Sequence, residues 1–287
     1  MSLDLGILGL LGYVWSFEFM QHAIETGTII AIVAGVTGYF VVLRRSAFTA
    51  HAFSEIGFAG ASGAILLGIA PIGGMLLGSI LGGLAIAALG RRAASRDTQI
   101  GIVLAFALGL GLLFISLYKA FDTAAISILF GEILGISTDQ VLLTVVAGVG
   151  ILFAIGAIYR PLLFASLDED VAEAKGMPML FLGTAFLLVV AVAVSFAVQV
   201  TGVLLIFSLM VTPAATAQYL TRRPVWGIAF SVAISVFATW VGLFVGFYTP
   251  YPVSFFITAI AFVFYLAVRL TERGLGRTDA GLKSRTD

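Results

Sequence analysis

Residues 179–198 have the sequence MLFLGTAFLLVVAVAVSFAV, twenty consecutive positions without a charged side chain. A helix needs about 20 predominantly apolar residues to cross the hydrocarbon core of a bilayer. The stretch therefore predicts a transmembrane helix. Comparable apolar runs recur on both sides of it, and the complete set of nine is 19–43, 51–70, 72–89, 99–118, 139–159, 179–198, 202–220, 225–247 and 254–270. The chain is thus predicted to be an all-α, polytopic transmembrane helix bundle of about nine spans.

The composition supports a membrane protein. Charged residues make up 10% of the 287 residues and hydrophobic residues 61%, with a mean hydropathy of +1.14. A soluble domain carries about 25% charged residues, so water is not the expected solvent. The absence of cysteine excludes disulfides, thiolate metal sites and iron–sulfur clusters, and a net charge of zero argues against nucleic acid as a partner.

The positions of Lys and Arg orient the chain, because cytoplasmic loops of membrane proteins collect these residues. With nine spans, all the basic clusters fall on one side of the membrane and Lys119 alone falls on the other. This segregation predicts an N-terminus outside and a C-terminus inside. The clusters are Arg44–Arg45, Arg91–Arg96, Arg160–Lys175, Arg222–Arg223 and Arg269–Arg285.

Two shorter apolar pieces, Leu3–Trp15 and Ala124–Ile136, are left out of the count of spans. Pieces of about 10–14 residues are more typical of interfacial or re-entrant segments. Counting Ala124–Ile136 as a tenth span would also place the later basic clusters outside, so we expect a re-entrant or short helix there.

The predicted organisation has three parts. Residues 1–18 form an N-terminal interfacial segment, residues 19–270 form the transmembrane domain, and residues 271–287 form a cytoplasmic tail. The transmembrane domain includes a cytoplasmic loop at 160–178.

Small residues and one proline bear on how the helices pack. Gly74, Gly78 and Gly82 follow a four-residue spacing, which predicts a seam for close approach of a neighbouring helix in this chain or in a partner. Pro213 lies inside the predicted seventh span. It is expected to kink that helix, and the carbonyls it frees are candidates to line a path.

His51 and Glu55 are the strongest chemical signal. Four residues apart on a helix, their side chains share one face, where an imidazole nitrogen and a carboxylate suit a divalent ion such as Zn²⁺, Mn²⁺ or Fe²⁺. Ser54 is a candidate weak ligand. Two hypotheses remain open from the residues alone: a metal or proton path, and a buried polar pair in which Glu55 accepts a hydrogen bond from His51 or a nearby hydroxyl.

Other ionisable groups give weaker candidates for a metal path. Glu18, His22 and Glu25 share a face at the outer end of the first span, as an external site or as a solvated helix end. Glu132 is an isolated carboxylate in an apolar setting, a candidate for a gate or a lining position.

The chain has no nucleotide-binding loop of its own. Such a loop needs a lysine in a glycine-rich frame, and Lys119, Lys175 and Lys283 are the only lysines, none of them in that frame. Any ATP hydrolysis would therefore belong to another chain. Residues 168–176 have acidic residues first and then Lys and Gly, the polarity typical of a short helix, which we expect to be a docking helix.

The order and spacing of several segments resemble one family, the membrane permease subunits of the zinc, manganese and iron(II) branch of bacterial ABC importers. The resemblance covers nearly the whole chain after residue 18. The segments that carry it are Phe40–Arg45, Leu129–Gly131 with Leu134–Gly135, the loop residues Asp168, Ala172, Ala174 and Gly176, Gly202–Leu205, and Pro213–Ala215.

In that family, the helix after the Arg-Arg pair typically carries Asp and, four residues on, His, which are implicated in passing the metal. Those positions align with His51 and Glu55 here. The resemblance implies that the transported ion is the only metal and that no cofactor is bound permanently. It also implies an extracytoplasmic metal-binding protein, a second permease copy that is identical or a paralogue, and a location in the bacterial cytoplasmic membrane. A cytoplasmic ATPase would grip Asp168, Glu169, Ala172, Ala174 and Gly176.

Two alternative functions stay open on the sequence. An ion-coupled secondary carrier would use Glu55 for proton exchange and would need no ATPase. An ABC permease for a metal chelate such as a siderophore would share the bundle but would need a wide cavity with fewer ionisable ligands.

Overall fold

A computed structural model describes residues 12–88, 93–118, 131, 133 and 135–283. Within them the chain is helical, and we found no strand in this part. The helices are α2 (Glu18–Leu43), α3 (Ala47–Leu66), α4 (Pro71–Ala88), α5 (Ala93–Ser116), α7 (Thr138–Leu167), α8 (Glu169–Ala174), α9 (Met179–Thr201), α10 (Val203–Leu220), α11 (Pro224–Tyr248) and α12 (Val253–Lys283).

Six helical stretches of the described chain are long and apolar enough to cross a membrane: Glu18–Leu43, Thr98–Ser116, Thr138–Leu167, Met179–Thr201, Pro224–Tyr248 and Val253–Glu272. Pro71–Ala87 and Leu205–Leu220 are shorter apolar helices. Helix α3 belongs to neither set, because small and polar residues, His51 and Glu55 among them, lower its hydropathy. The helix that carries the candidate site is therefore not among the strongly apolar ones.

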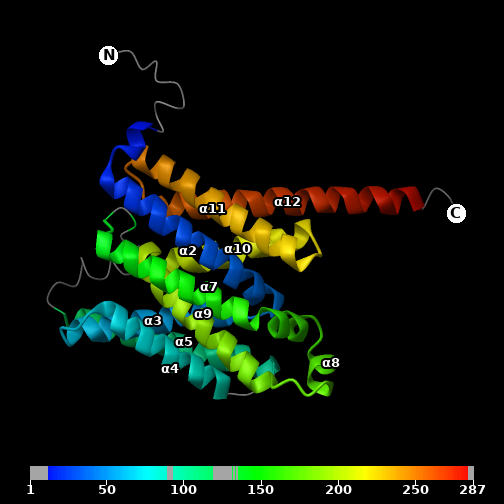
Figure 1. Cartoon of the computed structure of the whole chain (residues 1–287), viewed down its shortest axis with the longest axis horizontal. Helices are drawn as coiled ribbons and strands as arrows, with labels where there is room; N and C mark the ends of the chain where they lie inside the picture. The colour runs from blue at the N-terminus through cyan, green and yellow to red at the C-terminus, as the bar shows by residue number, and fades with distance from the viewer. Residues whose placement is uncertain (1–11, 89–92, 119–130, 132, 134, 284–287) are drawn as a thin grey trace, which may run out of the picture.

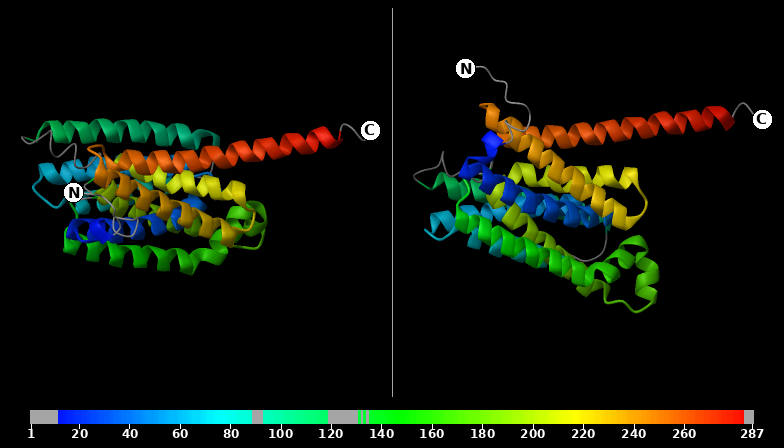
Figure 2. Two further views of the ribbon diagram at one scale, coloured as in Figure 1. Left: turned by 90° about the horizontal axis from the view of Figure 1, so that it is seen from above. Right: turned by 45° about the horizontal axis from the view of Figure 1, so that its top comes forward.

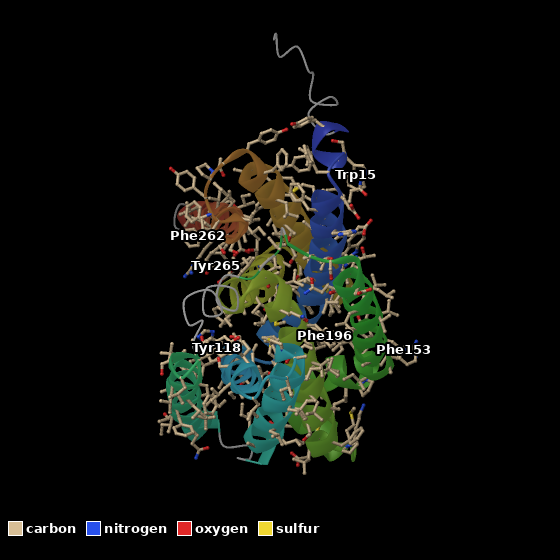
Figure 3. All side chains as sticks on the ribbon, turned by 90° about the vertical axis from the view of Figure 1, so that its left-hand side faces the viewer. Trp15, Tyr118, Phe153, Phe196, Phe262 and Tyr265 are labelled. Atoms are coloured by element: carbon tan, nitrogen blue, oxygen red, sulfur yellow. The ribbon has the colours of Figure 1, made fainter. Side chains whose placement is uncertain are left out.

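The helices pack side by side, with α2 and α9 inside the bundle and α5 and α7 on opposite outer faces (Figures 1 and 2). Helix α2 contacts α7, α10 and α11, while α3 packs mainly on α4 and α5. The outer faces expose large apolar side chains; Phe153, on the outside of α7 in Figure 3, is 77% exposed. Such a surface suits lipid rather than water.

The segments that join α2 to α3, α7 to α8 and α10 to α11 lie at one end of the bundle, on the right in Figure 1. These segments hold the basic clusters Arg44–Arg45 and Arg222–Arg223, with Arg160 near the end of α7. These basic residues therefore lie together at one end of the bundle. They are among the residues from which the sequence predicted the orientation of the chain in the membrane.

Several predicted boundaries change. The loop expected at 160–178 is shorter, because α7 continues through Pro161 to Leu167. The last span and tail expected at 254–270 and 271–287 are not separated at residue 270, since α12 runs without a break to Lys283 and past the other helices (Figure 2). The second span begins earlier than expected, at Ala47, and ends at Leu66. Hydropathy marks where apolar residues lie, whereas a helix ends where its backbone hydrogen bonds stop.

Two other predicted segments are only partly visible. Of the N-terminal segment 1–18, residues 1–11 lie outside the described part of the chain, and residues 12–15 form a helical turn before α2. Most of the piece predicted to be re-entrant, Ala124–Ile136, also lies outside it. Its described residues Ile133 and Ile136 are buried.

Candidate metal transit site

Helix α3 places His51 and Glu55 on one face, one turn apart, close to the basic end of the bundle. His51 is half-buried and Glu55 is 7% exposed. Only three residues, Arg44 to Ser46, separate α3 from α2, so the position of this face is fixed by a short connection.

Both side chains have a buried atom without a hydrogen-bond partner in the described structure: Nδ1 of His51 and Oε2 of Glu55. Leaving a buried polar group unpaired costs about 1–3 kcal/mol, and more for a charged group. The buried-pair hypothesis would have these atoms bonded to each other or to a neighbouring hydroxyl, and no such bond forms at them. Two orphan ligand atoms one turn apart are a chemical reason to expect a bound cation.

The surroundings of the pair differ from what sequence reasoning expected. Ser54 donates its hydroxyl to the backbone carbonyl of His51, at 2.7 Å, and so bonds the helix rather than the neighbouring side chains. Phe207 of α10 lies against the imidazole, with ring centroids 5.0 Å apart and planes at 58°. Phe207 is 36% exposed, so the pair lies at the edge of this chain's core and not at its centre.

The glycine seam of α4 holds α3 in place within the same chain. A Cβ at Gly74 would meet the carbonyl oxygen of Gly60, and at Gly78 it would lie 3.0 Å from the carbonyl oxygen of Ile56. At Gly82 it would lie 2.9 Å from the Ile56 side chain. Ser79 adds a hydrogen bond of 3.3 Å to the carbonyl of Phe53. Helices α3 and α4 are thus in backbone contact along the stretch that follows Glu55.

Helix α10 departs from regular geometry at two points. It is joined to α9 through Gly202 alone, whose φ of +81° favours glycine. Pro213 lies inside the helix, and the carbonyl that it frees, that of Leu209, accepts a hydrogen bond of 3.4 Å from Ser235 of α11. That carbonyl therefore stabilises helix packing instead of lining an open path.

The outer cluster does not gather into a metal site. Glu18 and Glu25 are exposed, and Nδ1 of His22 donates to the carbonyl oxygen of Ile136 at 3.0 Å. Among the described residues, no group of three or more His, Asp or Glu side chains could hold a metal ion. Glu132 lies outside the described residues.

The predicted docking helix is α8. Its N-cap Asp168 accepts a hydrogen bond of 2.9 Å from the backbone of Val171, and its C-terminus is closed at Gly176, with φ of +75°. Ala172 is fully buried, whereas Glu169, Ala174 and Val171 are exposed. Any partner would therefore contact the exposed side of α8, and Ala172 anchors the helix to the bundle.

The sequence did not reveal the contact of Phe207 or the positive φ of Gly202, although Gly202 begins one of the segments that carry the family resemblance. An aromatic residue in an apolar run carries no signal of its own, because its role depends on which helix lies opposite. A glycine followed by an apolar run resembles an ordinary loop end, although a positive-φ position between two helices could have been suspected from it.

An apolar multi-helix bundle with two ionisable side chains on one helix face is typical of the class of polytopic membrane proteins that pass ions or protons. The chain matches solved and curated proteins over most of its length. PsaBC from Streptococcus pneumoniae, solved in complex with Fab, superposes with a TM-score of 0.82 and 29% identity, covering 92% of this chain and 95% of that one.

Two curated relatives are similarly close. The manganese import system permease protein ScaB of Streptococcus parasanguinis is 31% identical over 252 residues, 87% of this chain and 89% of that protein. The manganese transport system membrane protein MntC of Halalkalibacterium halodurans is 29% identical over 209 residues, 72% of each chain. A profile of the ABC 3 transport family matches residues 16–272, and the chain belongs to that family.

Family membership decides several questions that the sequence left open. The chain is a multi-pass membrane permease subunit and not the ATPase. It works in an ABC transporter, with an ATPase and a binding protein as partners, and it is not an ion-coupled secondary carrier.

Proposed function

We propose that this chain is the permease of an ATP-driven manganese importer and that His51 and Glu55 hold the ion briefly during its passage. The curated relatives ScaB and MntC are named for manganese, which supports this choice of ion. In the proposed topology nine helices cross the membrane: the six long apolar helices together with α3, α4 and α10. The N-terminus then lies outside and the basic end of the bundle lies in the cytoplasm.

The observation that carries the proposal is the pair of orphan ligand atoms, Nδ1 of His51 and Oε2 of Glu55. A carboxylate oxygen beside an imidazole nitrogen suits Mn²⁺ and Fe²⁺, and it suits Na⁺ or K⁺ poorly. Two protein ligands hold an ion weakly, and weak holding is required because a transported ion has to leave.

A second permease copy would complete the site. Two donors from one chain leave most of the coordination shell of a divalent ion unfilled, and the described residues supply no third His, Asp or Glu. A copy related by a two-fold axis would present the same pair from the opposite side, giving two imidazoles and two carboxylates. The partial exposure of His51 and Phe207 supports a site that opens toward such a copy.

Helix α8 is the proposed contact with the cytoplasmic ATPase. It lies at the same end of the bundle as the basic clusters, and Glu169, Val171 and Ala174 are exposed on it. No permanently bound cofactor is proposed, since the transported ion is the cargo and ATP would bind only to the partner.

The test is uptake of radiolabelled Mn²⁺ by cells that express the complete transporter. The double variant His51→Ala/Glu55→Ala should lose uptake by at least about tenfold, while its membrane level and its co-purification with the ATPase stay unchanged. Ser62→Ala is the matched control, because Ser62 is a buried polar residue of the same helix that bonds only its own backbone, at 2.7 Å. Undiminished uptake in the double variant would remove the pair from the path.

The same uptake assay shows whether the transported substrate is the free metal ion or a metal chelate. Mn²⁺ supplied as the free ion should be taken up, and excess strong chelator should abolish uptake. Uptake that occurs only when the metal is chelated would move the protein to the metal-chelate branch.

A further inference from the structure

Arg44 lies between the helices on either side of α8. It is the C-cap residue of α2, and its Nη1 donates to Oγ of Ser166 on α7 at 3.3 Å. Its guanidinium carbon also lies 5.5 Å from the ring centre of Phe186 on α9, at a distance typical of a cation–π contact. Helix α8 follows α7 and precedes α9, so one side chain contacts both helices that hold it.

The contact on α7 is close to α8 itself. Ser166 precedes the N-cap residue of α8, Asp168, by two positions, and its own hydroxyl donates to the carbonyl of Leu162 at 2.5 Å. The Ser166 oxygen is therefore held by α7 while it accepts from Arg44. Movement of the start of α8 would displace this oxygen directly.

The turn from α2 to α3 is short and is held by backbone hydrogen bonds. Arg45 has a φ of +53°, which is unusual for a residue other than glycine. The backbone of Arg45 donates to the carbonyl of Val42 at 3.0 Å, and that of Ser46 donates to the carbonyl of Val41 at 2.8 Å. These two bonds form a Schellman motif, which locks the connection between the helices.

Helix α3 begins directly after this turn. His51 lies about 6 Å of helix rise beyond the first residue of α3, since each residue adds about 1.5 Å. A displacement of Arg44 would therefore reach His51 and Glu55 through a locked turn and a single rigid helix.

We propose that Arg44 is the positioning residue that couples movement of α8 to the His51–Glu55 pair. When the ATPase pulls on α8, Ser166 and Phe186 move with the ends of α7 and α9, and Arg44 transmits that movement to α3. This inference rests on the proposed function, because it states that ATP hydrolysis drives a displacement of His51 and Glu55.

The first measurement is the number of Mn²⁺ ions transported per ATP hydrolysed, by the permease reconstituted with its ATPase and binding protein. Arg44→Gln should lower this ratio at least about fivefold while ATP hydrolysis stays within about twofold of the unaltered protein. Ser166→Ala should lower the ratio of Mn²⁺ to ATP less than Arg44→Gln does. Arg44→Gln combined with Ser166→Ala should give the same ratio as Arg44→Gln alone, because both changes remove the same interaction. Arg45→Gln is the control, since it removes an exposed charge from the same turn.

The second measurement follows the movement itself. The chain contains no cysteine, so labels can be attached at introduced cysteines alone. With spin labels at Ala174→Cys on α8 and Leu67→Cys at the end of α3, the distance between them should stay nearly constant on ATP binding. In the Arg44→Gln background, the same distance should change with ATP. Both labelled positions are exposed.

Each outcome bears on the proposal. The proposal would be overturned if Arg44→Gln kept the transport ratio of the unaltered protein and if its label distance still did not change on ATP binding. Arg44 would then be a packing residue. If Arg44→Gln fails to insert, Ser166→Ala decides, because it removes only a hydroxyl; an unchanged ratio there would also overturn the proposal. Failure of the proposed function would look different: the unaltered protein would transport no Mn²⁺, or His51→Ala/Glu55→Ala would transport it undiminished.

Discussion

Gly74 and Gly73 are adjacent on α4, yet a methyl group should have opposite effects at the two positions. A Cβ at Gly74 would meet the carbonyl oxygen of Gly60 on α3 and would lie 2.6 Å from Cβ of Ala64. A Cβ at Gly73 would have nothing within 4 Å. The pair therefore tests the backbone contact that holds the site helix.

The expected magnitude follows from this geometry. Ordinary van der Waals contact begins at 3.4 Å, so Ala64 and the added methyl would have to separate by about 0.8 Å, and overpacking of this kind costs about 1–3 kcal/mol. Replacing a helical glycine by alanine recovers up to about 1 kcal/mol at either position, and this gain cancels in the comparison. Gly74→Ala should thus be less stable than Gly73→Ala by about 1–3 kcal/mol.

Thermal unfolding in detergent, followed by monodisperse size-exclusion peak height, measures the difference. Gly73→Ala should melt at or above the temperature of the unaltered protein, and Gly74→Ala several degrees below it. Because α3 carries His51 and Glu55, Gly74→Ala should also lower Mn²⁺ uptake at equal membrane levels. If Gly74→Ala proved as stable as Gly73→Ala, the close approach of α3 and α4 would be wrong.

Three further substitutions test local geometry. Arg45→Gly should raise the free energy of unfolding by about 0.5–1 kcal/mol, because glycine adopts the positive φ at the end of α2 without strain, and a melting temperature below that of the unaltered protein would contradict this. Val171→Arg, on the exposed side of α8, should reduce co-purification of the ATPase while leaving the melting temperature unchanged. Ala172→Arg should lower the melting temperature instead, since Ala172 is fully buried, and full ATPase recovery with Val171→Arg would exclude that side of α8 from docking.

Part of the candidate site could be predicted from the sequence because it is local. The four-residue spacing of His51 and Glu55 fixes their shared face on any helix, and the acidic start and Gly176 end of α8 encode its caps. The positions of Glu18, His22 and Glu25 obey the same helical spacing. They do not form a metal site, because His22 bonds a backbone carbonyl more than a hundred residues away in the chain.

The sequence by itself determined that the protein is a membrane helix bundle, which end of it is basic, and which pair of ligands shares a helix face. These properties depend on hydropathy, charge and helical period, which are local to each segment. The tertiary structure alone decided that Phe207 covers His51, that Ser235 satisfies the carbonyl freed by Pro213, and that Arg44 contacts both helices adjoining α8. Those contacts join residues far apart in the chain, and their partners are chosen by how whole helices pack, which no short stretch of sequence specifies.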